Sequence, residues 1–234
     1  MASGRGTRPE VALALVGVGM LVVIGYPVIA AHAVEAFGAR AVGAGILGMG
    51  LASFAASARR SVPGLGLWLR ALPVAVAALA FASGDVRFVQ LVPAAIEAML
   101  CGLFLGSLRG GGSILQHAAL QLEPFAPDFI GPYCRKASVA FAALFAAQAV
   151  ALTALAFTAP AQAWVSVASW LIWAPTLAGT FVEFLVRKAW FRHYGAGLLD
   201  RVLRALFPPE NTAQGRRSLD WIRQKRSELG MPPP

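Results

Sequence analysis

The chain has 234 residues, of which 58% are hydrophobic and only 13% charged, and its formal net charge is +9. A soluble domain carries about 25% charged residues to keep its surface hydrated. This composition therefore excludes an ordinary soluble enzyme, a disordered chain and a secreted disulfide scaffold, and it is typical of an all-α membrane protein. The two cysteines, Cys101 and Cys134, are expected to be free thiols.

Six apolar stretches are expected to cross the membrane as helices. A helix rises about 1.5 Å per residue, so about 20 apolar residues cross a hydrocarbon core of about 30 Å. In chain order the stretches are residues 11–31, 41–58, 65–83, 88–108, 137–159 and 163–186. In the second stretch, Gly43 and Gly50 lie about two turns apart and predict a face that another helix approaches closely.

The basic residues determine the expected topology. If the N-terminus lies inside, every lysine and arginine except Arg40 and Arg87 falls on the cytoplasmic side, as the positive-inside rule requires. We therefore predict a six-span domain over residues 1–194 with both termini in the cytoplasm. The positive charge is interpreted as a topology signal and an attraction to anionic lipid, and no nucleic-acid partner is expected.

Two cytoplasmic segments carry helical patterns of their own. The apolar residues between Ile114 and Leu122 recur at helical spacing and predict a short interfacial helix, after which Pro124, Pro127 and Pro132 predict an extended connector. The tail, residues 195–234, begins with an amphipathic pattern over 198–207, in which leucines alternate with arginines and an aspartate. Such a helix is expected to lie on a membrane surface. Asn211 is expected to cap a second tail helix that ends at Gly230.

Glu97 is the acidic residue nearest the middle of a predicted span, where a charge costs about 3 kcal/mol to insert. It must therefore face protein or water. Two interpretations stay open: a carboxylate that contacts a substrate or carries a proton, or a protonated, neutral glutamic acid hydrogen-bonded to another helix. Nearer the cytoplasm, Glu183 precedes Arg187 by four residues and predicts a helical ion pair.

The sequence contains no recognisable catalytic or metal-binding motif. It lacks a nucleophile elbow, a P-loop, a dinucleotide-binding glycine pattern and the H-E-x-x-H pattern of zinc proteases. His117 is followed five residues later by Leu122, so the His–Asp pair of acyltransferases is missing. The three histidines are scattered, and neither a metal nor another cofactor is expected. Whether the protein is an enzyme therefore stays open, with a membrane-embedded enzyme as a third possibility.

Two stretches resemble a known group of proteins. The runs LEPFAPDFIGPYCRKAS over residues 122–138 and VEFLVRKAWFRHY over 182–194 are similar to small bacterial inner-membrane proteins encoded beside aryl polyene and fatty-acid-type biosynthetic genes. Their recurrent features are E-P-x-x-P, then Y-T-R-[KR]-x-[ST], then E-[YF]-L-V-R-[RK]. Cys134 stands where that pattern favours threonine, and Glu97 stands where a neutral amide is expected. The resemblance covers about residues 72–194.

The resemblance implies a location in the bacterial inner membrane and an accessory role in lipid or aryl polyene biosynthesis. The protein would hold acyl or polyene intermediates, or dock soluble carrier and synthase partners, since acyl carrier proteins are acidic. The expected partner or headgroup contacts are Arg109, Tyr133, Arg135, Lys136, Glu183, Arg187 and Lys188. The alternative is a small transporter or flippase for a lipid-like substrate that uses Glu97 and works as a homo-oligomer.

Overall fold

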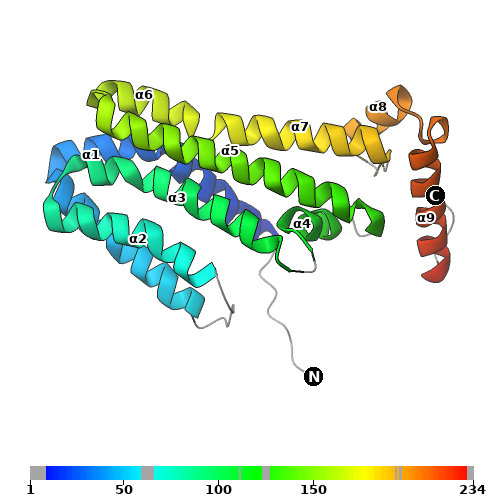
Figure 1. Ribbon diagram of the computed structural model, residues 1–234, viewed down its shortest axis with the longest axis horizontal. Helices are drawn as coiled ribbons and strands as arrows, with labels where there is room; N and C mark the ends of the chain where they lie inside the picture. Colours follow the sequence, from blue (N-terminus) through cyan, green and yellow to red (C-terminus); the bar gives the residue numbers. More distant parts are fainter. Residues whose placement is uncertain are drawn as a thin grey trace. The chain divides into compact units, whose positions relative to one another are not determined.

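The computed structural model describes residues 9–58, 66–110, 112–122, 127–192, 194 and 197–230. Glu123, Pro124 and His193 lie outside these residues. The described part of the chain is helical and contains no strand, which confirms the all-α prediction (Figure 1). Its elements are α1 (Pro9–Ala58), α2 (Gly66–Ser83), α3 (Val86–Ser107), α4 (Ile114–Leu122), η1 (Asp128–Ile130), α5 (Gly131–Thr158), α6 (Ala161–Leu171), α7 (Ala174–Phe191), α8 (Leu198–Leu206), η2 (Pro209–Asn211) and α9 (Ala213–Glu228).

Four helical stretches of the described chain are long and apolar enough to cross a membrane: Gly25–Ala55, Val86–Ser107, Gly131–Thr158 and Ala161–Phe191. Large apolar side chains are exposed along them, among them Val150 (71%), Trp170 (64%) and Phe181 (57%). An apolar surface of this kind is stable in lipid and unfavourable in water. These stretches are compatible with a membrane protein.

The first two predicted spans correspond to two helical arms of α1 that meet at a kink instead of at a loop. The change of direction is confined to Gly38, whose φ of 80° and ψ of 158° are not helical. Glycine adopts a positive φ without steric cost, so one residue suffices where a loop was expected. Figure 1 shows the two arms of α1 diverging from this bend, with the second arm beside α2.

The last predicted span is interrupted between α6 and α7. Pro175 has no N–H, so the carbonyl of Leu171, four residues earlier, receives no helical hydrogen bond from it. The buried amide of Gln148 on α5 replaces this donor: its Nε2 lies 2.7 Å from the Leu171 carbonyl oxygen and 3.2 Å from that of Ile172. Gln148 of α5 thus supplies the hydrogen bond that the Leu171 carbonyl does not receive from Pro175.

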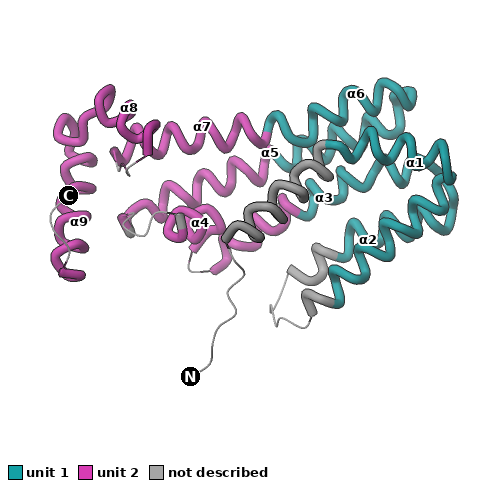
Figure 2. Tube along the Cα trace, turned by 180° about the vertical axis from the view of Figure 1, so that it is seen from behind, with its two compact units in different colours: residues 1–99, 145–175 teal, residues 100–144, 176–234 magenta. Residues whose placement is uncertain are grey.

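By their internal contacts the residues group into two compact units, each described here separately (Figure 2). Unit 1 comprises residues 1–99 and 145–175. Its core contains Trp164 and Ala168 of α6 with Leu152 of α5. The predicted close approach of a second helix is also present here, since a Cβ at Gly43 would lie 2.7 Å from the backbone nitrogen of Phe81.

Unit 2 comprises residues 100–144 and 176–234. Ala119 of α4, Cys134 of α5 and Phe191 of α7 are buried together and hold these three helices to one another. The predicted extended connector is shorter than expected, because η1 and α5 begin before Pro132, and proline is well tolerated in the first turn of a helix.

Within the tail, α8 and α9 lie where helices were predicted. The cap of α9 is Thr212 and not Asn211, since the Thr212 side chain accepts a hydrogen bond from the Gly215 N–H. The predicted domain boundary at residue 194 stays a prediction.

Candidate functional site

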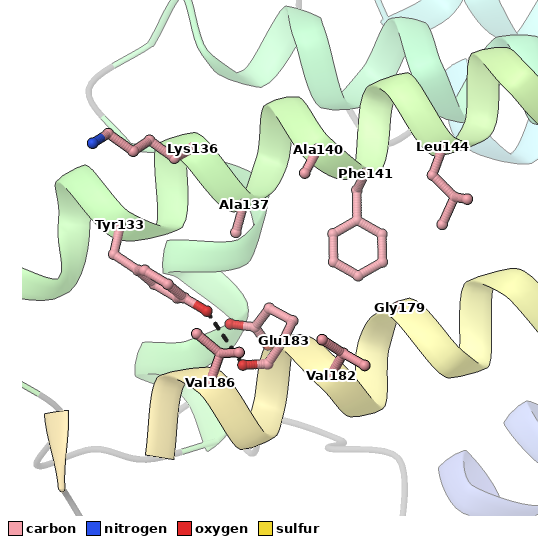
Figure 3. Close-up of a pocket in the computed structure, with 10 residues that line it drawn as sticks. All are labelled: Tyr133, Lys136, Ala137, Ala140, Phe141, Leu144, Gly179, Val182, Glu183 and Val186. Carbon is pink, nitrogen blue, oxygen red and sulfur yellow. Dashed lines mark hydrogen bonds between the residues drawn. The ribbon is translucent and has the colours of Figure 1, made fainter. Parts of the chain in front are cut away.

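A groove of about 400 Å³ runs between α5 and α7 in unit 2 (Figure 3). Its walls are almost entirely apolar, and polar side chains gather near one end. The lining residues are Tyr133, Lys136, Ala137, Ala140, Phe141, Leu144, Gly179, Val182, Glu183 and Val186. Three of them, Tyr133, Lys136 and Glu183, belong to the set predicted from the sequence.

The apolar walls follow from helical spacing on two facing helices. On α5, Ala137, Phe141 and Leu144 recur three or four residues apart and so share one face. On α7, the absence of a side chain at Gly179 keeps the groove open. A Cβ added there would lie 3.3 Å from a methyl group of Leu144 and 3.6 Å from the ring of Phe141.

The polar end is built from one residue of α5 and two of α7. The Tyr133 hydroxyl donates a hydrogen bond of 3.3 Å to the backbone carbonyl of Glu183. The Glu183 carboxylate in turn pairs with Arg187, with 3.1 Å between Oε1 and Nε, and both side chains are largely buried. The helical ion pair expected from the four-residue spacing therefore forms, and it lies at this end of the groove.

The remaining cations on α5 point elsewhere. Figure 3 shows the Lys136 side chain extending from α5 away from α7, so that its ammonium lies at the rim of the groove. The Arg135 Nη2 donates a hydrogen bond of 3.0 Å to the backbone carbonyl of Leu108, just after the end of α3, and Arg109 beside it is exposed. Arg135 therefore tethers the start of α5 and is not one of the groove's lining residues.

Lys188 also faces away from the groove. Successive helical residues are rotated by about 100°, so Lys188 projects from a different side of α7 than Arg187 does. There its ammonium lies 3.1 Å from a carboxylate oxygen of Asp200 on α8, and the side chain is only 2% exposed. The structure thus separates the seven predicted contact residues. Tyr133, Glu183 and Arg187 form the polar end of the groove and Lys136 lies at its rim, whereas Arg109, Arg135 and Lys188 are not part of it.

Glu97 lies in the part of α3 that belongs to unit 1 and is 4% exposed. Its Oε2 atom is buried and has no hydrogen-bond partner among the described residues. One of the two interpretations of Glu97 was a neutral glutamic acid hydrogen-bonded to another helix. The structure shows no such hydrogen bond at Oε2 among the described residues. Unit 1 has a hollow of its own, which is lined in part by Trp164 and Gln90. Glu97 is not among its lining residues.

Sequence reasoning did not identify the apolar half of the groove. The spacing of Ala137, Phe141 and Leu144 was available as a signal, but a face of this kind also serves ordinary helix packing. Gly179 had no signal, because its role depends on the helix opposite. Within the described ranges, no three His, Cys, Asp or Glu side chains gather where they could hold a metal ion.

Comparisons of this chain with protein-family models, with curated proteins and with solved structures find no match. The resemblance to inner-membrane proteins of polyene and fatty-acid biosynthesis therefore rests on the sequence patterns alone.

Proposed function

We propose that the protein is an integral membrane protein that binds the chain of an amphiphile in the groove between α5 and α7. The observation that carries this proposal is the shape of the groove, which has apolar walls and one polar end formed by Tyr133, Glu183 and Arg187. An extended acyl or polyene chain fits the walls. Its polar head would lie at Tyr133 and Arg187, with Lys136 at the rim.

Selectivity must come from the polar end and from shape. In water, burial of each methylene group is worth about 0.8 kcal/mol, but a chain that enters the groove from a bilayer leaves an equally apolar environment. The apolar walls therefore contribute little net free energy. Hydrogen bonds and charge at the head of the ligand are worth more in this surrounding, and we expect them to decide which amphiphile binds.

The biological role that we propose is that of an accessory protein of lipid or aryl polyene type biosynthesis in the bacterial inner membrane. It would hold acyl or polyene intermediates, or dock soluble carrier and synthase partners on its cytoplasmic face. The exposed Arg109 and Lys136 would attract an acidic acyl carrier protein. Carrier binding in a low-salt pull-down that is unchanged after both residues are replaced by glutamine would contradict the docking role.

The topology that we propose has six spans with both termini in the cytoplasm. The two arms of α1 would supply the first two spans, α2 and α3 the next two, α5 the fifth, and α6 with α7 the sixth. The concentration of lysine and arginine in the inner segments supports this topology, and residues 195–234 would form the cytoplasmic tail.

Photochemical labelling tests the proposed function directly. The full chain is reconstituted in nanodiscs with a fatty acid that carries a diazirine on its chain, and the labelled residues are mapped by mass spectrometry. We expect labels to concentrate on Ala140, Leu144 and Val182, and an excess of unlabelled fatty acid to suppress them. The proposal would be refuted if the labels followed general lipid exposure, so that Val150 was labelled as strongly as the groove residues, and if unlabelled fatty acid did not suppress the labelling.

A second candidate function is supported by Glu97. A buried carboxyl oxygen without a partner in an apolar helix is typical of proton- or substrate-coupled transport. The protein would then be a small transporter or flippase for a lipid-like substrate, working as a homo-oligomer. Loss of transport in Glu97→Gln, with insertion unchanged, would favour this function, and full transport by that variant would remove its main support.

A further inference from the structure

The first tail helix, α8, carries an exposed apolar stripe. At about 100° per residue, Leu198, Leu199, Val202 and Leu206 fall on one side of this helix. Their exposed fractions are 77%, 44%, 48% and 66%, so each of these side chains keeps a large apolar surface that the described part of the protein does not cover. Leu203, at the edge of the stripe, is the apolar residue of α8 that is buried.

Two polar residues of α8, Asp200 and Arg204, contact the protein instead. Asp200 forms the ion pair with Lys188 at the end of α7, and the Lys188 side chain is nearly inaccessible. The Arg204 guanidinium lies over the ring of Tyr194, and its Nη2 donates a hydrogen bond of 3.4 Å to the Tyr194 carbonyl. This orientation is the reverse of the one in a soluble protein, where an amphipathic helix turns its apolar side inward.

The surroundings of α8 indicate what covers the stripe. Trp190, on the last turn of α7, is 66% exposed, and tryptophan is enriched where a membrane helix meets the interface. Only a short connector follows before α8 begins at Leu198. Arg201 is exposed beside the stripe, where its guanidinium can reach lipid phosphates. The apolar stripe thus continues an apolar helix end and is flanked by positive charge.

We propose that α8 lies in the interface of the membrane that α7 crosses, with its leucine stripe among the acyl chains and Arg201 at the phosphates of anionic lipids. The inference rests on the proposed membrane-spanning function. It adds a lipid-binding surface whose orientation is determined by the buried Lys188–Asp200 pair. Because α7 also lines the groove, this pair links the position of α8 to one wall of the ligand site.

Site-specific fluorescence in nanodiscs tests the proposal. The environment-sensitive dye NBD is attached to Leu198→Cys on the stripe, or to Arg201→Cys outside it, in a chain that carries Cys101→Ala; Cys134 is buried and is retained. A third label at Val150→Cys reports on the span itself. Lipids with a doxyl quencher within the acyl chains are included, and the bilayer is either zwitterionic or enriched in phosphatidylglycerol.

We expect the Leu198 label to emit at shorter wavelength than the Arg201 label and to be quenched at least about twofold more, as for a helix immersed by about 5–10 Å. Phosphatidylglycerol should increase the quenching of the Leu198 label. A Leu198 label that is as hydrated as the Arg201 label, while the Val150 label is in lipid, would overturn this inference alone. A hydrated Val150 label would overturn the membrane function itself.

A second copy of the chain could also cover the stripe, and the same samples distinguish this case. Nanodiscs with one protein each should give the full effect if lipid covers α8. A blue shift that disappears at one protein per nanodisc, and returns when copies are mixed, would assign the stripe to a dimer and overturn the lipid proposal. Lys188→Met provides a further check, because loss of the pair with Asp200 should reduce the difference between the Leu198 and Arg201 labels.

Discussion

Replacement of Gln148 by methionine removes one amide and preserves the length of the side chain. In the structure this amide donates to the carbonyls of Leu171 and Ile172 at 2.7 and 3.2 Å, at the break that Pro175 causes between α6 and α7. Both carbonyls lie in an apolar surrounding where water cannot replace the donor. We therefore expect the methionine variant to fold and to be clearly less stable.

The expected magnitude follows from the unsatisfied acceptor. A buried carbonyl that loses its donor costs about 1–3 kcal/mol. For a chain of this length, each kcal/mol lowers Tm by about 2–4 °C, which gives a decrease of about 2–12 °C. Gln162→Met is the matched control, since Gln162 is exposed on α6 and the same substitution should there change Tm by very little.

Pro175→Ala provides the decisive comparison. Alanine restores an N–H four residues after Leu171, so the helix itself can satisfy that carbonyl. Gln148→Met should then cost less in the Pro175→Ala background than in the original chain, with a coupling of about 1 kcal/mol. Thermal unfolding in mild detergent, followed by tryptophan fluorescence, measures the four chains of this comparison and the Gln162→Met control. Equal costs in both backgrounds, or a Gln148→Met effect no larger than that of Gln162→Met, would refute the reasoning.

Three further predictions concern the groove, the buried acid and Tyr194. Gly179→Leu should fill the groove and weaken fatty-acid binding by about tenfold, or about 1.4 kcal/mol; Gly48→Leu, at an open position of α1, should leave binding unchanged in the same photolabelling assay. Glu97→Gln should insert and melt like the original chain, because the amide keeps the shape of the acid, and a transport assay in proteoliposomes then tests the carboxyl group alone. Burial raises the pKa of Tyr194 above that of an unfolded tyrosine, which is about 10. The neutral phenol therefore stabilises the folded state below about pH 10, and this stabilisation is lost as the pH rises through the folded-state pKa. Tyr194→Phe, which also loses the hydrogen bond to the Phe207 carbonyl, should cost about 1 kcal/mol at neutral pH and show a smaller loss of stability in alkaline solution; an unchanged alkaline melting profile would contradict this.

The amino-acid sequence by itself determined the helical, apolar character of this protein and most element positions. Runs of apolar residues without charge can satisfy their backbone only as helices in lipid, so composition alone predicts the fold class. Local patterns also predicted the helix at the start of the tail, because α8 lies within the segment 198–207 whose leucines and arginines follow a helical period. The Glu183–Arg187 pair was predictable for the same reason, because a four-residue separation brings two side chains together on any helix.

Other features depended on residues far apart in the chain. Gly38 was one of many glycines in the sequence, and nothing near it in sequence marked it as the one with a positive φ. The break at Pro175 was not predicted, and nothing near it in sequence indicated that Gln148 would supply the missing donor. The groove arises because α5 and α7 face each other across Gly179, so a list of basic and aromatic residues could place only its polar end.

The orientation of α8 shows the same division most clearly. Its pattern of leucines and arginines predicts an amphipathic helix, and such a helix can cover a protein core or lie on a membrane. The tertiary structure shows which side of α8 is left uncovered: the buried contact between Lys188 and Asp200 turns Asp200 toward α7, and the leucines of the stripe stay exposed. Periodicity within one helix determines which residues share a face, whereas the direction of that face depends on which partner offers a charge to its polar side.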